Sequence, residues 1–134
     1  MYRKILFSLA FMCFLVTPSC KKESNPTHQI TGLWEGTYTC CSQPALYFSF
    51  TVYPDGTLTY KSKGINNETF YASGTWSLSG SAFTYDVTTL NTPGGPSHQV
   101  GSATYSSAGT LTNGINTDVD TDVAGIFSMN KVKD

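Results

Sequence analysis

Three aspartates towards the C-terminal end of the chain have a spacing that can bind metal. Asp118, Asp120 and Asp122 occupy the first, third and fifth positions of an acidic loop, which is how an EF-hand calcium loop begins. Val123 then stands where that loop needs a glycine, and Met129 stands where it needs a bidentate glutamate. We therefore expect a solvated hairpin turn, with weak adventitious calcium binding as the alternative, and no resident metal or cofactor.

Other side chains with catalytic chemistry are sparse. The two histidines, His28 and His98, belong to no recognisable nucleophile or metal motif, so we expect that the protein is not an enzyme. The chain has 8 basic and 9 acidic residues and no basic run that could hold a phosphate backbone. Nucleic acid is therefore not an expected partner.

Cys40 and Cys41 are adjacent in sequence. Neighbouring Cα atoms lie about 3.8 Å apart, below the usual disulfide range of about 4.4 to 6.8 Å, and neighbouring side chains on a strand point to opposite faces. The alternatives are a strained vicinal disulfide, two thiols with Cys40 buried as a small apolar side chain, or an intermolecular bond through Cys41.

The N-terminal segment predicts export. A basic start, Tyr2–Lys4, precedes the mostly apolar run Ile5–Val16, which is too short to span a bilayer unaided. This combination is typical of a signal peptide, and it places the protein in a disulfide-permissive compartment.

The junction Thr17–Cys20 resembles the lipobox of bacterial lipoproteins, because a small residue stands directly before a cysteine and charged residues follow. The resemblance implies that residues 1–19 are removed and that Cys20 is acylated on its sulfur and its new amine. More than one acyl chain gives stable anchoring. An ordinary secretory signal cut elsewhere is the alternative. The 115 residues from Cys20 onward carry six lysines, nine acidic residues and no arginine.

Residues 20–29 have no apolar periodicity and are expected to be a tether, and a folded domain is expected over 30–134. From Ile30 onward apolar residues alternate with polar ones, which predicts β-strands. Eight such segments are joined by short turns, and the longest loop is expected at Asn91–Ser97. The sequence therefore predicts an all-β domain, a small antiparallel up-and-down eight-stranded β-barrel or, alternatively, a β-sandwich.

Several short motifs of this domain resemble the lipocalin-like domain of small bacterial lipoproteins: Gly32–Tyr38, Pro54–Thr57, Ser73–Gly80 and Gly125–Met129. The resemblance implies a calycin-type barrel that is closed at one end by the Gly-x-Trp strand. In lipocalins an arginine on the last strand lies over that tryptophan, which is Trp34 here. With no arginine available, Lys131 or Lys133 is the nearest substitute.

Ten aromatic residues fall on the inward parity of the expected strands, and a barrel of this size can either fill itself with them or hold one small ligand. Glycines on the same parity, such as Gly36, Gly74, Gly101 and Gly125, are expected to leave room for a ligand. The residues expected to line such a pocket are Trp34, Tyr38, Phe50, Trp76 and Tyr105.

Two functions are consistent with these features. The first is a binding protein of the bacterial cell envelope, anchored by lipid on Cys20, in the outer membrane and facing the periplasm or the cell surface, that holds a small hydrophobic molecule in its barrel. The second is an accessory protein with a filled barrel that binds another envelope component. An apolar cavity favours the first function, and a filled barrel with an exposed apolar patch favours the second.

Overall fold

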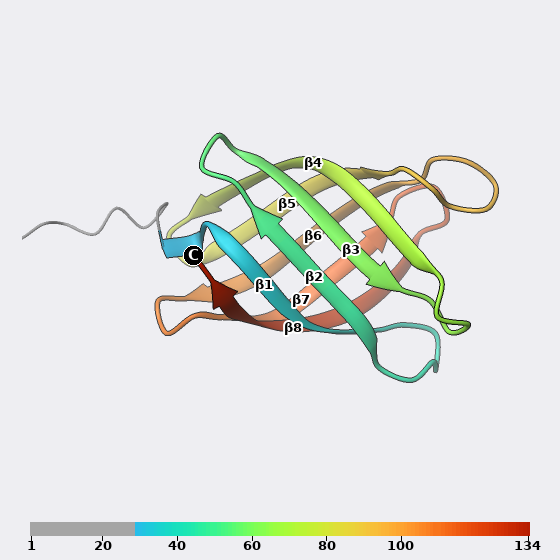
Figure 1. Ribbon diagram of the computed structural model, residues 1–134, viewed down its shortest axis with the longest axis horizontal. Coiled ribbons are helices and arrows are strands. Elements are labelled where there is room, and N and C mark those ends of the chain that lie inside the picture. The colour runs from blue at the N-terminus through green and yellow to red at the C-terminus, as the bar shows by residue number, and fades with distance from the viewer. Residues whose placement is uncertain (1–28) are drawn as a thin grey trace, which may run out of the picture.

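A computed structural model describes residues 29–134, which form a closed antiparallel barrel of eight strands in which each strand pairs with its neighbours in sequence and β8 pairs with β1 (Figure 1). The expected up-and-down barrel is confirmed, and the β-sandwich alternative is wrong. Cys20, His28 and the expected signal segment lie outside the described residues. The strands are β1 (Gly32–Thr39), β2 (Leu46–Val52), β3 (Thr57–Lys63), β4 (Thr69–Ser79), β5 (Ala82–Thr89), β6 (His98–Ser106), β7 (Thr110–Asp118) and β8 (Val123–Lys133).

Alternation of burial, which is strict in β5, shows why these segments form a barrel. In β5 the side chains of Phe83, Tyr85 and Val87 are buried, while Thr84 and Asp86 between them are exposed. The other strands follow this pattern less strictly, since Ser49 on the outward row of β2 is also buried. Within the part of the chain that is described, no helix is long and apolar enough to cross a membrane.

Aromatic rings fill the middle of the barrel. Phe50 is fully buried, and its ring centroid lies 4.9 Å from that of Phe48, 5.0 Å from that of Tyr85 and 5.5 Å from that of Phe127. All three pairs have the edge-to-face geometry that aromatic rings prefer. The interior at this level is therefore a packed core.

The inward glycines leave no free space, so the expectation that they make room for a ligand is wrong. A Cβ atom at Gly101 would lie 2.2 Å from the ring of Tyr85, and one at Gly125 would lie 2.3 Å from the ring of Tyr38. At Gly36 a Cβ atom would meet the backbone of the neighbouring strand. These positions lack side chains because a tyrosine ring or a backbone occupies the space.

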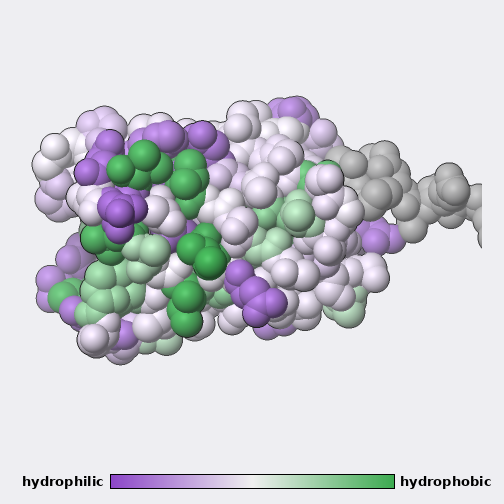
Figure 2. Space-filling view, turned by 180° about the vertical axis from the view of Figure 1, so that it is seen from behind, coloured by the Kyte–Doolittle hydropathy of each residue, from purple (hydrophilic) through white to green (hydrophobic). Residues whose placement is uncertain are grey.

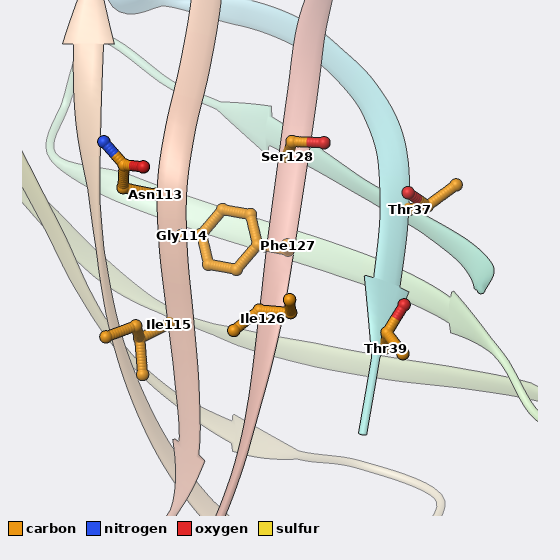
Figure 3. A pocket seen from close by; sticks show the side chains of 8 residues that line it. All are labelled: Thr37, Thr39, Asn113, Gly114, Ile115, Ile126, Phe127 and Ser128. Carbon is orange, nitrogen blue, oxygen red and sulfur yellow. The ribbon is translucent and has the colours of Figure 1, made fainter. Parts of the chain in front are cut away.

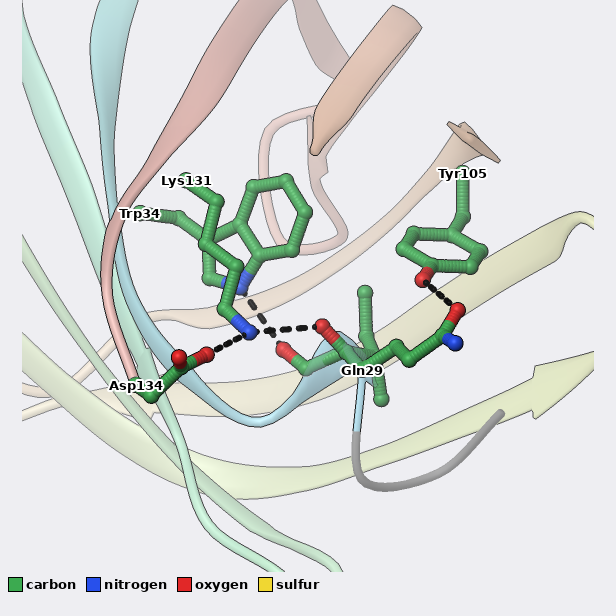
Figure 4. Close-up of polar contacts among 6 residues, drawn as sticks. Gln29, Trp34, Tyr105, Lys131 and Asp134 are labelled. Atoms are coloured by element: carbon green, nitrogen blue, oxygen red, sulfur yellow. Dashed lines mark hydrogen bonds and ion pairs between the residues drawn. The ribbon is translucent and has the colours of Figure 1, made fainter. Parts of the chain in front are cut away.

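A polar cluster closes the end of the barrel at which the described chain begins (Figure 4). Gln29 and Ile30 have helical backbone, and the indole Nε1 of the fully buried Trp34 donates a 2.7 Å hydrogen bond to the Ile30 carbonyl. The ammonium group of Lys131, whose Cα pairs with that of Trp34, donates to the Gln29 carbonyl at 2.9 Å. The Tyr105 hydroxyl donates to the Gln29 side chain at 3.3 Å. Lys131 thus ties β8 to the Gln29–Ile30 segment next to Trp34.

Candidate functional site

A pocket opens at the opposite end of the barrel, where the β1–β2, β3–β4, β5–β6 and β7–β8 connections lie, away from the marked C-terminus (Figure 1). We call this end the mouth. The longest of these connections is 90–97, as expected, and its residues 92–97 form one side of the pocket. The mouth pocket has a volume of about 490 Å³, and its other lining residues include Tyr60, Phe70, Gln99, Asp118 and Asp120. A volume of this size lies in the range of small-molecule sites, about 300 to 1,000 Å³.

A network of tyrosines and amides separates the mouth pocket from the apolar core. The Tyr60 hydroxyl donates to Oε1 of Gln99, and Nδ2 of Asn116 donates to the same oxygen at 3.1 Å. The Tyr85 hydroxyl donates to Oδ1 of Asn116 at 2.6 Å, and Tyr38 also hydrogen bonds to Asn116. Tyr60 and Gln99 belong to both the network and the lining, so the pocket has a polar floor.

Burial keeps the tyrosines of this floor protonated well beyond neutral pH. Burial raises the pKa values of Tyr60 and Tyr85 well above that of an exposed tyrosine, because water no longer stabilises the phenolate. Both hydroxyls are therefore donors at neutral pH.

The acidic loop stabilises the rim of the mouth. Oδ1 of Asp118 accepts hydrogen bonds from the backbone N–H groups of Asp120 at 3.1 Å and Thr121 at 3.0 Å, and its Oδ2 accepts one from the Ser97 hydroxyl. The Ser97 hydrogen bond is the main reason why the pKa of Asp118 is lowered. Oδ2 of Asp120 accepts a hydrogen bond from the backbone N–H of His98. The segment is a hairpin turn between β7 and β8, and the structure groups no three metal-ligating side chains within residues 29–134.

The five residues expected to line a ligand pocket do not line the mouth pocket, although Trp76 lines a separate hollow of about 470 Å³ on the outer wall. Trp34 and Tyr105 belong to the closed end, and Phe50 is central in the aromatic core. Trp76 is half-buried, packs against the core, and donates from its indole Nε1 to the Tyr53 carbonyl at 2.8 Å. Tyr38 lies in the network below the mouth, and none of the five lines the mouth pocket.

Three polar residues on inward positions could have indicated the mouth from the sequence. Gln99, Asn116 and Asp118 have the parity of the inward glycines of β6 and β7, yet they are polar. A polar side chain on an inward position near a strand end needs a polar partner there. These inward polar side chains could have predicted the polar network, but not the β5–β6 loop that lines the pocket above it.

Cys40 and Cys41 form a vicinal disulfide in the connection between β1 and β2. Opposite-facing side chains would require both residues to lie on a strand, whereas β1 ends at Thr39. Cys41 and Ser42 have φ values of 57° and 61°, so the chain turns directly after the strand, and the two side chains are not held on opposite faces. Cys40 is half-buried and Cys41 is exposed.

The outer wall of the barrel carries an apolar patch over β7 and β8. Ile115 and Ile126 are direct cross-strand partners with exposed fractions of 49% and 66%, and a groove of about 430 Å³ lies beside them (Figure 3). The segments 112–117 and 124–130 contain no charged residue. Hydrophobic side chains also gather on the mouth half of the face in Figure 2.

The fold and the site define a class, a closed eight-stranded up-and-down β-barrel with a polar pocket at one end. This architecture is compatible with ligand binding. No protein-family model, no curated protein and no solved structure shows significant similarity to the chain.

Proposed function

We propose that this chain is a lipid-anchored binding protein of the bacterial cell envelope, with a lipocalin-like barrel that takes up a small molecule at its mouth. The observation that carries the proposal is the mouth pocket of about 490 Å³, which lies above a polar floor. Below that floor the aromatic core leaves Phe50, Phe83 and Leu58 fully buried. The proposed ligand therefore sits in the mouth and not among the aromatic side chains of the core.

The direction of the barrel fits an anchor on Cys20. Gln29, the first described residue, lies at the closed end, and a chain of nine residues can reach about 30 Å at most. A lipid on Cys20 would therefore keep the closed end within about 30 Å of the membrane. This geometry allows the mouth to face away from the membrane, where a ligand can enter it.

We expect that the Cys20→Ser variant leaves the membrane fraction, because the acyl chains that anchor the protein can no longer be attached. The measurement is fractionation of cells that produce the full chain, followed by detection in membrane and soluble fractions. A Cys40→Ser variant is the control and is expected to stay with the membrane, since Cys40 belongs to the β1–β2 connection. If the Cys20→Ser protein resists a high-salt wash of the membranes, acylation at this residue is wrong.

Binding at the mouth predicts a particular pattern in NMR spectra. Trp34 and Trp76 are the only tryptophans of the chain and lie away from the mouth pocket, whereas Gln99 lines it. We expect a bound ligand to shift the side-chain amide signals of Gln99 and to leave both indole N–H signals in place. The ligands tested are octanoate, decanol, glucose, N-acetylglucosamine and maltose. Shifts of the indole signals without a shift at Gln99 would place the ligand in the core and contradict the mouth site.

A second candidate function rests on the outer wall. The uncharged segments 112–117 and 124–130, with the exposed Ile115 and Ile126, are a surface to which another protein could bind. This patch, together with the filled core, favours an accessory protein that binds an envelope component. If an Ile126→Asp variant loses a protein partner while no small molecule shifts the Gln99 amide, this second function replaces the first.

A further inference from the structure

The charge of the mouth pocket restricts the ligands that it can hold. Asp118 and Asp120 line the pocket, and none of its described lining residues is basic. The hydrogen bonds from Ser97, Asp120 and Thr121 stabilise the charged form of the Asp118 carboxylate. A carboxylate or phosphate group on the ligand would be repelled, because like charges at short range interact unfavourably in a partly buried site.

The hydrogen-bonding groups of the pocket require a ligand that both donates and accepts. Oε1 of Gln99 already accepts from Tyr60 and from Asn116, so Nε2 of Gln99 is the donor that this side chain offers to a ligand. The carboxylates of Asp118 and Asp120 only accept. An ammonium group only donates and would leave the Gln99 amide without an acceptor. A hydroxyl group can accept from Gln99 and donate to a carboxylate.

The pocket also contains apolar surface. Phe70 lines it from β4, and Pro93 and Pro96 line it from the β5–β6 loop. A ligand that matches the charge, the hydrogen-bonding groups and the apolar surface of the pocket has no negative charge, carries several hydroxyl groups and has a flat face of C–H groups. A sugar ring combines these features, and the pocket volume of about 490 Å³ suits a small ligand.

We propose that the mouth pocket binds a small neutral saccharide and that Gln99 is the residue that selects it. The proposal rests on the mouth site described under the proposed function and adds the chemical class of its ligand. It differs from the hydrophobic ligand expected from the sequence, because the polar floor and the two carboxylates lie where the ligand would enter.

Titration of the isotope-labelled full chain tests this proposal. The probes are N-acetylglucosamine, glucose and maltose, with glucuronate as an anionic sugar, ethylammonium as a cation without a hydroxyl group, and octanoate and decanol as apolar chains. We expect at least one neutral sugar to bind saturably and to shift the Gln99 side-chain amide. Glucuronate should bind at least about tenfold more weakly than glucose if the carboxylates repel its charge.

Three variants give the matched comparison. Gln99→Ala should weaken sugar binding by about tenfold or more, since a ligand hydrogen bond is lost, whereas Gln43→Ala in the exposed β1–β2 connection should not change it. Asp118→Asn should reduce the preference for glucose over glucuronate, because it removes one negative charge while its amide oxygen can still accept the loop hydrogen bonds. Spectra of the free variants report whether each one is folded.

The outcomes separate this proposal from the mouth site itself. If octanoate, decanol or ethylammonium shifts the Gln99 amide and no neutral sugar does, the saccharide proposal is overturned while the mouth site stands. If no probe shifts that amide, both are overturned. Sugar binding that is unchanged in a folded Gln99→Ala protein would overturn the role of Gln99.

Discussion

Replacing Trp34 with alanine is expected to destabilise the domain by about 3 to 5 kcal/mol, the range for removal of a large buried aromatic side chain. Trp34 is fully buried, its ring centroid lies 6.1 Å from that of Tyr105, and its indole N–H bonds to the Ile30 carbonyl. The substitution therefore leaves a cavity and also removes the hydrogen bond that holds the Gln29–Ile30 segment over the closed end. The measurement is the free energy of unfolding from urea titration of the full chain.

Tyr47→Ala is the matched control, because Tyr47 lies on the outward parity of β2. Its hydroxyl donates to Glu35 at 2.8 Å on the barrel surface, and loss of such a contact costs about 1 kcal/mol or less. Equal losses of stability in the two variants would contradict the inward position of Trp34. The whole register of β1 would then be in doubt, since a shift of one residue exchanges the inward and outward faces.

The strands could be predicted from the sequence because one face of each is buried and the other is solvated. Leu58 and Tyr60 alternate with exposed threonine and lysine in β3, and the chain turns before it at Gly56, whose φ of 86° lies in the left-handed region that favours glycine. Such patterns are local, so a single sequence contains them. The closure of β8 on β1 joins the first strand to the last, so no local pattern contains it, although closure leaves no strand edge unpaired.

The mouth pocket could not be predicted in the same way because its residues come from distant parts of the chain. Tyr60 and Gln99 are separated by 39 positions, and Asp118 joins them only after β7 has crossed the barrel. The aromatic residues were expected to line a ligand pocket because their inward parity is clear. The inward parity of a residue does not determine how far along the barrel axis its ring lies. In the middle of the barrel the packed rings occupy the space that a ligand would need.

Replacing the inward glycine Gly36 with alanine is expected to destabilise the barrel. Elsewhere in a strand interior the same substitution normally stabilises a protein by roughly 0.5 to 1 kcal/mol. At Gly36, however, a Cβ atom would lie 1.9 Å from the carbonyl oxygen of Ser128 and 2.7 Å from Cα of Met129. Both atoms belong to the backbone of β8, so no change of rotamer can relieve the conflict.

We therefore expect Gly36→Ala to cost at least about 3 kcal/mol, the upper part of the range for overpacking, because β1 and β8 are the two strands that close the barrel. Gly80→Ala is the control: a Cβ atom there meets nothing within 4 Å, and its positive φ of 60° alone should cost about 1 kcal/mol. Urea unfolding of both full-length variants measures the difference. A Gly36→Ala protein as stable as the parent would show that β1 and β8 do not approach each other as closely as the barrel requires.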